Sequence, residues 1–246
     1  MLIYGHRGAS KYHLEHSLEA YTQAIKVGAD GFECDVRLTV DGEIICWHDR
    51  GTKRITGKNL FIAHSTLEEL SFAKPLKFST LLDLAIKHKK NLAIETKHPV
   101  PTGKAIETAV LDMLEDRKAD IEASGIEINI MSFSKAALFD IQNCPYLGVF
   151  LTPRAMGIFT PKAPVVAPRI KSVKNNPELI QRMHEAGKKV YVWTVNEVED
   201  ILLCASLGVD AIISDVPGLA RLTLNHWQKR TVIGTLLPVK LLGSPA

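Results

Sequence analysis

Two acidic residues, Glu33 and Asp35, lie two positions apart in the apolar run Gly31–Arg37. Side chains alternate between the faces of a strand, so both carboxylates point to one face while Cys34 and Val36 point to the other. Buried carboxylates are costly unless a positive group compensates them. An exposed sheet edge is the ordinary alternative, but the apolar neighbours argue against it and favour a functional site.

A hairpin after this strand predicts how a histidine joins the two acids. Asp41-Gly42 separates the first run from a second β-like run, Ile44–His48, and Asp-Gly in this position is a strong hairpin signal. If these two residues are the centre of a two-residue turn, Asp35 faces His48. Cross-strand Cβ atoms lie about 5 Å apart, so the imidazole would stand beside the carboxylates. A shift by one residue would turn it away.

His6-Arg7-Gly8 directly follow the short apolar run Leu2–Gly5. Imidazole titrates near neutral pH, guanidinium is a bidentate phosphate donor, and glycine allows close approach to the backbone. The tripeptide is a weak signal by itself. Its position gives it weight, because the residues that follow barrel strands form the catalytic rim.

A third acid lies near the end of another apolar run. Glu95 and Lys97 are two apart in Leu92–Lys97 and share a face. We expect the three acids to converge, and a ligand set of oxygens alone favours a hard divalent cation, Mg²⁺ or Ca²⁺. Salt bridges to Lys97 and Arg7 are the metal-free alternative, but the acids outnumber the nearby cations.

Other polar or aromatic residues near strand ends have ordinary explanations. Trp193, in Val190–Val195, either walls a ligand cavity or packs in the core, which composition favours. Asp215, after Ala211–Ser214, is predicted to cap the segment that begins at Pro217. Six further histidines are expected to be solvated on loops or helix surfaces: His13, His64, His88, His98, His184 and His226.

Short apolar runs alternate with helix-like segments along most of the chain, which predicts an α/β fold with a parallel sheet. The candidate strands are Leu2–Gly5, Gly31–Arg37, Leu92–Lys97, Glu127–Ser132, Leu147–Leu151, Val165–Ala167, Val190–Val195 and Ala211–Ser214. The first helix is expected to begin after the N-cap Ser17 and to stop at Gly28. Eight strands fit a (β/α)8 barrel, which typically takes about 250 residues, and a doubly wound open sheet is the competitor.

The region from Thr39 to about Lys77 breaks this alternation, because beyond the hairpin it is irregular and polar. We interpret it as an insertion after the second strand, so that residues 1–246 form a single barrel domain. The tail from Asn225 to Ala246 has no clear period. It is expected to pack on the outside of the barrel or to fray.

Composition argues against several classes of protein. Thirty Lys and Arg against 27 Asp and Glu give a net charge of +3, which is too mild to indicate a nucleic-acid partner. The absence of a run of 18 uncharged apolar residues predicts no membrane span. The chain does not open with a basic region and an apolar core, and its four cysteines are scattered, which predicts a cytoplasmic protein with reduced thiols.

In their order and spacing these motifs resemble the glycerophosphodiester phosphodiesterase family. The residues that carry the resemblance are His6-Arg7, Gly28-Ala29-Asp30, Glu33-x-Asp35, Thr39-x-Asp41-Gly42, His48-Asp49, Glu95-x-Lys97, Ser132-Phe133, Trp193-Thr194-Val195-Asn196, Gly208-Val209-Asp210 and Ser214-Asp215-x-Pro217. They extend from about Tyr4 to Leu222, and together they are far more specific than any one of them.

The resemblance implies a (β/α)8 TIM barrel with a small insertion after the second strand. It implies hydrolysis of a small-molecule glycerophosphodiester to glycerol 3-phosphate and an alcohol. A divalent cation would be held by Glu33, Asp35 and Glu95. His6 and His48 would be the acid–base pair. Substrate and phosphate would be bound by Arg7, Lys97, Glu15 and Trp193.

The sequence departs from the family pattern in two places. His16 replaces an Asn in Leu14-Glu15-His16-Ser17, and the insertion, which usually shapes the alcohol pocket, is shortened around Ala73–Phe78. One alternative function is therefore a lysophospholipid or sphingolipid phosphodiesterase of phospholipase D type. A second is a non-catalytic barrel that binds a phosphorylated metabolite. A third is an aldolase-like barrel with Lys97 as the Schiff-base lysine.

Overall fold

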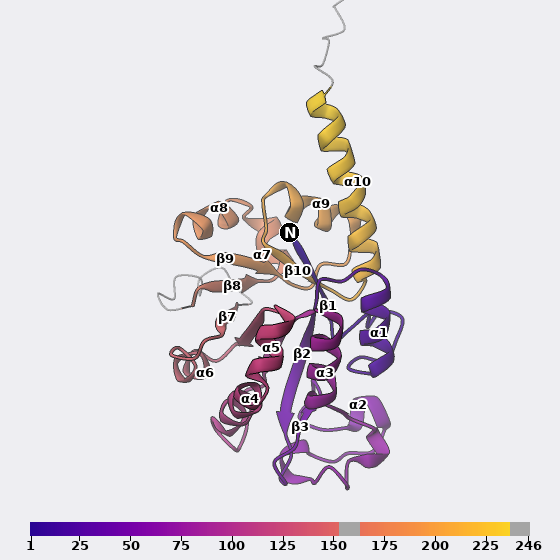
Figure 1. The fold of residues 1–246 in the computed structure, drawn as a ribbon, viewed down its shortest axis with the longest axis vertical. Helices are drawn as coiled ribbons and strands as arrows, with labels where there is room; N and C mark the ends of the chain where they lie inside the picture. The colour runs from indigo at the N-terminus through magenta and orange to yellow at the C-terminus, as the bar shows by residue number, and fades with distance from the viewer. Residues whose placement is uncertain (153–162, 237–246) are drawn as a thin grey trace, which may run out of the picture.

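Eight parallel strands close into a barrel in the computed structural model, which describes residues 1–152 and 163–236, without the side chains of 140 and 230–236. The strands are β1 (Leu2–His6), β2 (Gly31–Leu38), β5 (Asn91–Thr96), β6 (Ile128–Ser132), β7 (Leu147–Thr152), β8 (Val165–Pro168), β9 (Lys189–Val192) and β10 (Ala211–Ser214). The ring closes because β1 pairs with both β2 and β10 (Figure 1). The predicted (β/α)8 barrel is confirmed, and the open sheet is excluded.

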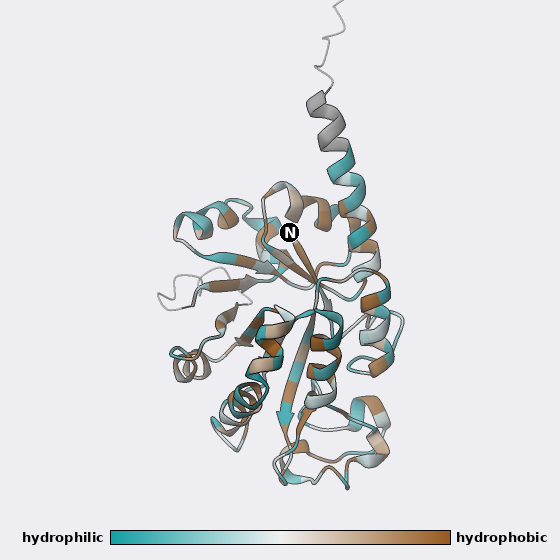
Figure 2. Ribbon diagram, in the orientation of Figure 1, coloured by the Kyte–Doolittle hydropathy of each residue, from teal (hydrophilic) through white to brown (hydrophobic). Residues whose placement is uncertain are grey.

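Helices surround the ring. They are α1 (Leu18–Lys26), α3 (Phe78–His88), α4 (Ala105–Asp116), α5 (Lys118–Ser124), α6 (Lys135–Asp140), α7 (Ile170–Asn175), α8 (Glu178–Glu185), α9 (Val198–Ser206) and α10 (Pro217–Leu236). The first begins as predicted, since the Ser17 hydroxyl accepts a hydrogen bond from the Ala20 amide at 3.1 Å. Figure 2 shows brown and teal residues alternating along these helices, as expected when one side of each helix packs on the barrel.

Apolar side chains fill both sides of the strands. Cys34 and Val36 point outwards into the layer beneath the helices. Tyr4, Tyr191 and Ile213 belong to a separate cluster inside the barrel. Because side chains alternate between the two faces of β2, Glu33 and Asp35 point to the inside of the barrel, as the sequence predicts. All four cysteines are free thiols.

The insertion after β2 has a small apolar core of its own, made by Ile45, Trp47, Ile62 and Leu70. Its elements are β3 (Ile44–Cys46), α2 (Lys53–Thr56), the short 3₁₀ helices η1 (Ile62–His64) and η2 (Ser71–Ala73), and β4 (Leu76–Lys77). Because β4 pairs antiparallel with β3 and leads directly into α3, the insertion returns the chain to the barrel wall. Figure 1 shows it as a lobe at the far end of β2.

The predicted register of the β2–β3 hairpin is wrong by one residue. The structure pairs Val36 with Cys46. The carbonyl of Asp35 accepts a hydrogen bond from the amide of Trp47 at 2.9 Å. Trp47, and not His48, is therefore the residue opposite Asp35.

The length of the loop explains this shift. The predicted two-residue turn places Val40 opposite Glu43, but the structure pairs Thr39 with Glu43, since the Thr39 amide donates to the Glu43 carbonyl at 3.0 Å. Three residues and not two therefore form the loop. Gly42 has a φ of +84°, the left-handed conformation that a three-residue hairpin loop needs after a type I turn. The Asp-Gly signal thus locates the hairpin correctly but does not give its loop length.

The C-terminal segment also differs from the prediction. The helix α10 continues without interruption to Leu236, and Figure 1 shows its second half projecting away from the barrel. Ala220 and Leu224 in its first half belong to the core. The second half extends the helix because no proline or glycine interrupts residues 219–233. Residues 237–246 of the predicted tail lie outside the described residues.

No helix in the described ranges is both long enough and apolar enough to cross a membrane.

Candidate active site

A cavity of about 310 Å³ opens at the carboxyl ends of the barrel strands. The predicted residues that line it are His6, Arg7, Glu33, His48, Glu95, Lys97 and Trp193. Two other predicted residues do not line it: Asp35 is fully buried behind it, and Glu15 lies at its edge in an ion-pair network. The structure therefore gathers side chains from β1, β2, β5 and the insertion into one site.

The three acids converge as predicted. Asp35 on β2 and Glu95 on β5 are direct partners in the parallel register, and Glu33 lies two residues before Asp35 on the same face. Each carboxylate offers one oxygen, and these oxygens lie within 4.8 Å of one another. All three side chains are buried.

Burial and crowding act against negative charge in this cluster. Burial and the neighbouring Asp35 raise the pKa of Glu33 well above its usual range and that of Glu95 to about 7. Burial also disfavours the charged form of Asp35. In that residue, however, the hydrogen bond from His16 and the charges of Lys97 and Arg7 prevail and lower the pKa. Such a site is suited to taking up a positive ion.

Two basic side chains already lie against the acids. The Lys97 Nζ atom is 2.8 Å from Asp35 Oδ1 and 2.6 Å from Glu95 Oε1. Arg7 Nε is 2.9 Å from Asp35 Oδ2, in ion-pair contact but not aligned for a hydrogen bond. Part of the metal-free alternative is thus present as a Glu95–Lys97 bridge. Glu33, by contrast, accepts one hydrogen bond from the described residues, from the backbone amide of Arg7 at 3.0 Å, and its Oε2 lies 3.9 Å from His6 Nε2.

The donor set fits a hard divalent cation. Three buried carboxylates face two basic side chains, and oxygen ligands are those that Mg²⁺ and Ca²⁺ prefer. Burial and the neighbouring charge of Asp35 keep the pKa values of Glu33 and Glu95 raised in spite of the two basic side chains. Lys97 would share Asp35 and Glu95 with such an ion.

His6 is held by an acid that the sequence analysis assigned to another role. Its Nδ1 lies 2.6 Å from Asp215 Oδ1, and the same carboxylate accepts hydrogen bonds from Ser10 and Asn196. Burial raises the pKa of Asp215, but these hydrogen-bond partners lower it by more, to about 2. The predicted capping role is therefore wrong. The position of Asp215 directly after β10, matching that of His6 and Arg7 at the end of β1, is the signal that would have found it.

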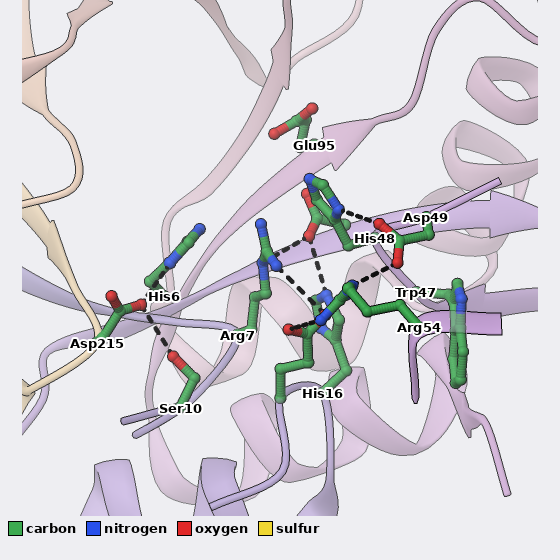
Figure 3. Close-up of polar contacts among 12 residues, drawn as sticks. His6, Arg7, Ser10, His16, Trp47, His48, Asp49, Arg54, Glu95 and Asp215 are labelled. Atoms are coloured by element: carbon green, nitrogen blue, oxygen red, sulfur yellow. Dashed lines mark hydrogen bonds and ion pairs between the residues drawn. The ribbon is translucent and has the colours of Figure 1, made fainter. Parts of the chain in front are cut away.

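His48 reaches the cavity in spite of the shifted register, because β3 ends at Cys46 and the chain bends after it. Its Nδ1 lies 2.8 Å from Asp49 Oδ1. Both histidines thus direct Nδ1 to an aspartate, which leaves Nε2 of each ring available to a ligand. Figure 3 shows the two rings on opposite sides of Arg7.

Arg54 of the insertion connects His48 to the barrel (Figure 3). It donates through Nε to Asp49, at 2.5 Å, and through Nη1 to Glu15, at 2.9 Å. Glu15 in turn accepts from Arg7 at 3.2 Å. Glu15, which the sequence assigned to the substrate, is therefore bound by two arginines. Arg54 itself was missed, because a basic residue on a short helix carries no local signal.

Comparison with known proteins agrees with this geometry. A family model described as the glycerophosphoryl diester phosphodiesterase family matches residues 6–219. The chain belongs to this family. A probable glycerophosphodiester phosphodiesterase 1 of Mycobacterium tuberculosis is 36% identical over 245 residues, which cover 88% of this chain and 89% of the relative.

Two solved structures share the fold of this phosphodiesterase family member. A glycerophosphodiester phosphodiesterase from Thermotoga maritima aligns with a TM-score of 0.75 at 24% identity, covering 89% of this chain and 96% of the other. A phosphodiesterase from Oleispira antarctica, in complex with its product sn-glycerol-3-phosphate, aligns with a TM-score of 0.74 at 18% identity, covering 92% and 97%.

His16, the residue that departs from the family pattern, lies beneath the acids. It is buried and has a φ of +59°, which is uncommon for a side chain of this size. Its Nε2 lies 3.0 Å from Asp35 Oδ2, and its Nδ1 lies 2.9 Å from the hydroxyl of Tyr21. This family member therefore holds the back of Asp35 with an imidazole, and the unusual backbone directs the ring inwards.

Trp193 forms one wall of the site in this phosphodiesterase family member. The Phe133 ring meets it edge-on at 5.5 Å, and the Arg169 guanidinium lies 4.8 Å from the centre of its ring. Its Nε1 donates to the carbonyl of Ala167 at 2.7 Å. Of the two explanations considered for Trp193, the cavity wall is correct. Arg169 lines the same cavity and was missed, although it directly follows β8.

Proposed function

We propose that this chain hydrolyses glycerophosphodiesters to glycerol 3-phosphate and an alcohol. The observation that supports this best is that two histidines, each bound through Nδ1 to an aspartate, border a cavity that is also lined by Glu33, Glu95, Arg7 and Lys97, with Asp35 buried behind it. Membership of the family supports the reaction class. The glycerol 3-phosphate in the Oleispira relative supports the product.

We propose that Glu33, Asp35 and Glu95 hold a divalent cation, Mg²⁺ or Ca²⁺. When bound, this ion supplies positive charge to the phosphoryl oxygens. Arg7 and Lys97 lie beside the same acids and add positive charge at the position of the phosphate. Arg7 is fixed between Asp35 and Glu15, so it needs little rearrangement to meet an anionic ligand.

The two histidines are the proposed proton carriers. Burial, together with the charges of Lys97 and Arg7, lowers the pKa of His48, which keeps its imidazole neutral and able to accept a proton near pH 7. We assign His48 to the proton of the nucleophile and His6 to the leaving alkoxide. Positioned acid–base groups typically contribute about 10²–10⁴-fold in rate.

The glycerol arm of the substrate would lie against the indole of Trp193, which Phe133 and Arg169 hold in place. The free thiols of all four cysteines support our further proposal of a cytoplasmic location.

The decisive experiment offers glycerophosphoethanolamine to the purified protein with Mg²⁺ or Ca²⁺ and measures release of glycerol 3-phosphate. Turnover with either cation is the expected result. Binding without turnover at saturating cation would instead support the non-catalytic barrel.

A further inference from the structure

A second cavity, of about 420 Å³, adjoins the site. It lies between the insertion and the loop that follows β5, and Lys97 borders both cavities. Most of its wall is apolar and is formed by Leu38, Phe61, Ile62, Pro99, Val100 and Ile106. The two cavities therefore meet at Lys97, and the second is the less polar of the two.

The charged groups that line this second cavity are basic. Arg37 and Arg50 are among its lining residues, and no carboxylate is. Arg37 donates two hydrogen bonds to the carbonyl of His48, at 2.7 and 3.1 Å. Among the residues that the structure describes, neither arginine forms an ion pair, and the Arg50 side chain is exposed.

Carboxylates near this cavity already have partners, and the two that touch its lining residue Lys97 are Asp35 and Glu95. Asp49 is bound by Arg54 and His48. Glu107, next to the lining residue Ile106, is bound by His98 at 2.7 Å. Within the described part of the chain, the two arginines therefore have no carboxylate in ion-pair contact at the cavity wall, although Asp35 and Asp49 attract Arg37 from farther away.

A phosphodiester has two ester arms, and the geometry offers a different space for each. With the phosphate beside Lys97, one arm faces the wall formed by Trp193, and the other passes Lys97 into the second cavity. The apolar wall of the second cavity has few groups that could bind the hydroxyls of glycerol. The second cavity therefore suits the alcohol arm better than the glycerol arm.

We infer that the second cavity receives the leaving alcohol and selects alcohols that carry no positive charge, with an apolar body. This inference rests on the proposed phosphodiesterase activity and assigns its substrate class. A cationic alcohol such as choline would meet two arginines that form no ion pair with the described residues, at a wall that no described carboxylate lines. A neutral alcohol of the same shape would meet only apolar contact.

The test compares two esters of equal shape. One is glycerophosphocholine, and the other carries 3,3-dimethylbutanol, in which carbon replaces the quaternary nitrogen. We expect kcat/KM to be about tenfold higher for the neutral ester, as one like-charge contact near a protein surface would give. The cationic nitrogen makes choline the better leaving group, so intrinsic reactivity works against this result.

The matched variants reverse one charge each. Arg50→Glu should lower the preference for the neutral ester severalfold, and Arg50→Gln should have an intermediate effect. Lys87→Glu, an equal charge change at an exposed position of α3, should leave the preference unchanged. Thermal unfolding of each variant confirms that it is folded.

The outcomes separate the two proposals. Equal kcat/KM for the two esters, preference for choline, or an unchanged ratio in Arg50→Glu would overturn the inference and leave the proposed function standing. Absence of turnover of both esters with either cation would overturn the proposed function and the inference with it.

Discussion

Each of the two histidines has an aspartate that fixes its orientation before any ligand arrives. Asp215 holds Nδ1 of His6, and Asp49 holds Nδ1 of His48. An imidazole held in this way keeps one tautomer and directs Nε2 to the same place in every molecule, which lowers the reorganisation needed during reaction. The site is therefore pre-organised mainly by hydrogen bonds between its own side chains.

Removal of either imidazole should abolish most of the activity. We expect His6→Ala and His48→Ala each to lower kcat by about 10²–10⁴-fold, because one proton transfer then lacks its carrier. Steady-state release of glycerol 3-phosphate measures the effect, and His88→Ala on an exposed helix end is the control. Retention of most activity in His48→Ala would remove His48 from the mechanism.

Asp215 should also affect stability in acid. Its pKa of about 2 lies below the value of about 3.9 in an unfolded chain. Ionised Asp215 therefore stabilises the fold above about pH 4, and this contribution is lost as the pH falls towards 2. The excess stability of the wild type over Asp215→Asn should shrink by about 2 kcal/mol over this range.

Urea unfolding of both proteins at intervals between pH 5 and pH 2.5 measures this difference. A difference that stays constant over the whole range would show that the carboxylate has an ordinary pKa in the folded protein.

The insertion depends on its connection to the barrel to place His48. The hairpin brings β3 beside β2, but its register alone turns the strand so that Trp47 faces Asp35. The bend after Cys46 and the contacts of Arg54 with Asp49 and Glu15 then determine where the imidazole lies. The insertion thus supplies His48 to the site, and Arg54 fixes the position of that histidine.

Arg54 should accordingly behave as a positioning residue. We expect Arg54→Met to lower kcat about tenfold, with a smaller effect on KM, because Asp49 and Glu15 lose a charge-assisted partner and His48 becomes less ordered. Lys53→Met, one residue away and also exposed, is the control. The pH profile of kcat should shift in Arg54→Met, whereas a merely structural loss would lower activity equally at every pH.

The strands could be predicted from the sequence because each is a short apolar run buried on both faces, and all eight are found within a few residues of the expected bounds. Glu33, Asp35 and Glu95 could be predicted for the same reason, since strand alternation fixes their side. The hairpin register could not, because the conformation of Gly42 decides between two and three loop residues. The pairing of His6 with Asp215 joins opposite ends of the chain, and the signal for it in the sequence is the position of Asp215 directly after a barrel strand.

At the scale of the whole molecule, the closed ring brings the two ends of the barrel sequence together. Because β1 pairs with β10, Asp215 becomes a neighbour of His6 across 209 positions of chain. The acids of β2 and β5 meet in the same way through their parallel register. Stability and site assembly are consequently linked, and a ligand of the acids should stabilise the entire barrel.

Addition of cation should raise the unfolding temperature. At a cation concentration of about 100 times the Kd, we expect a stabilisation of about 2.7 kcal/mol. Glu33→Gln should need more cation for the same shift and should regain part of its activity in excess cation. Differential scanning calorimetry with and without Mg²⁺ or Ca²⁺ measures this, with Glu19→Gln at an exposed position of α1 as the control. The same shift in both variants would place the ion elsewhere.

Lys97 touches Asp35 and Glu95 and also borders the space that extends beyond them. A change at this one position would therefore be expected to alter both the proposed cation site and the proposed choice of ester. Divergence of this protein towards new substrates would therefore be expected to spare Lys97 and to proceed through Arg50, whose side chain is exposed. Arg37 is less open to change, because it donates two hydrogen bonds to the carbonyl of His48.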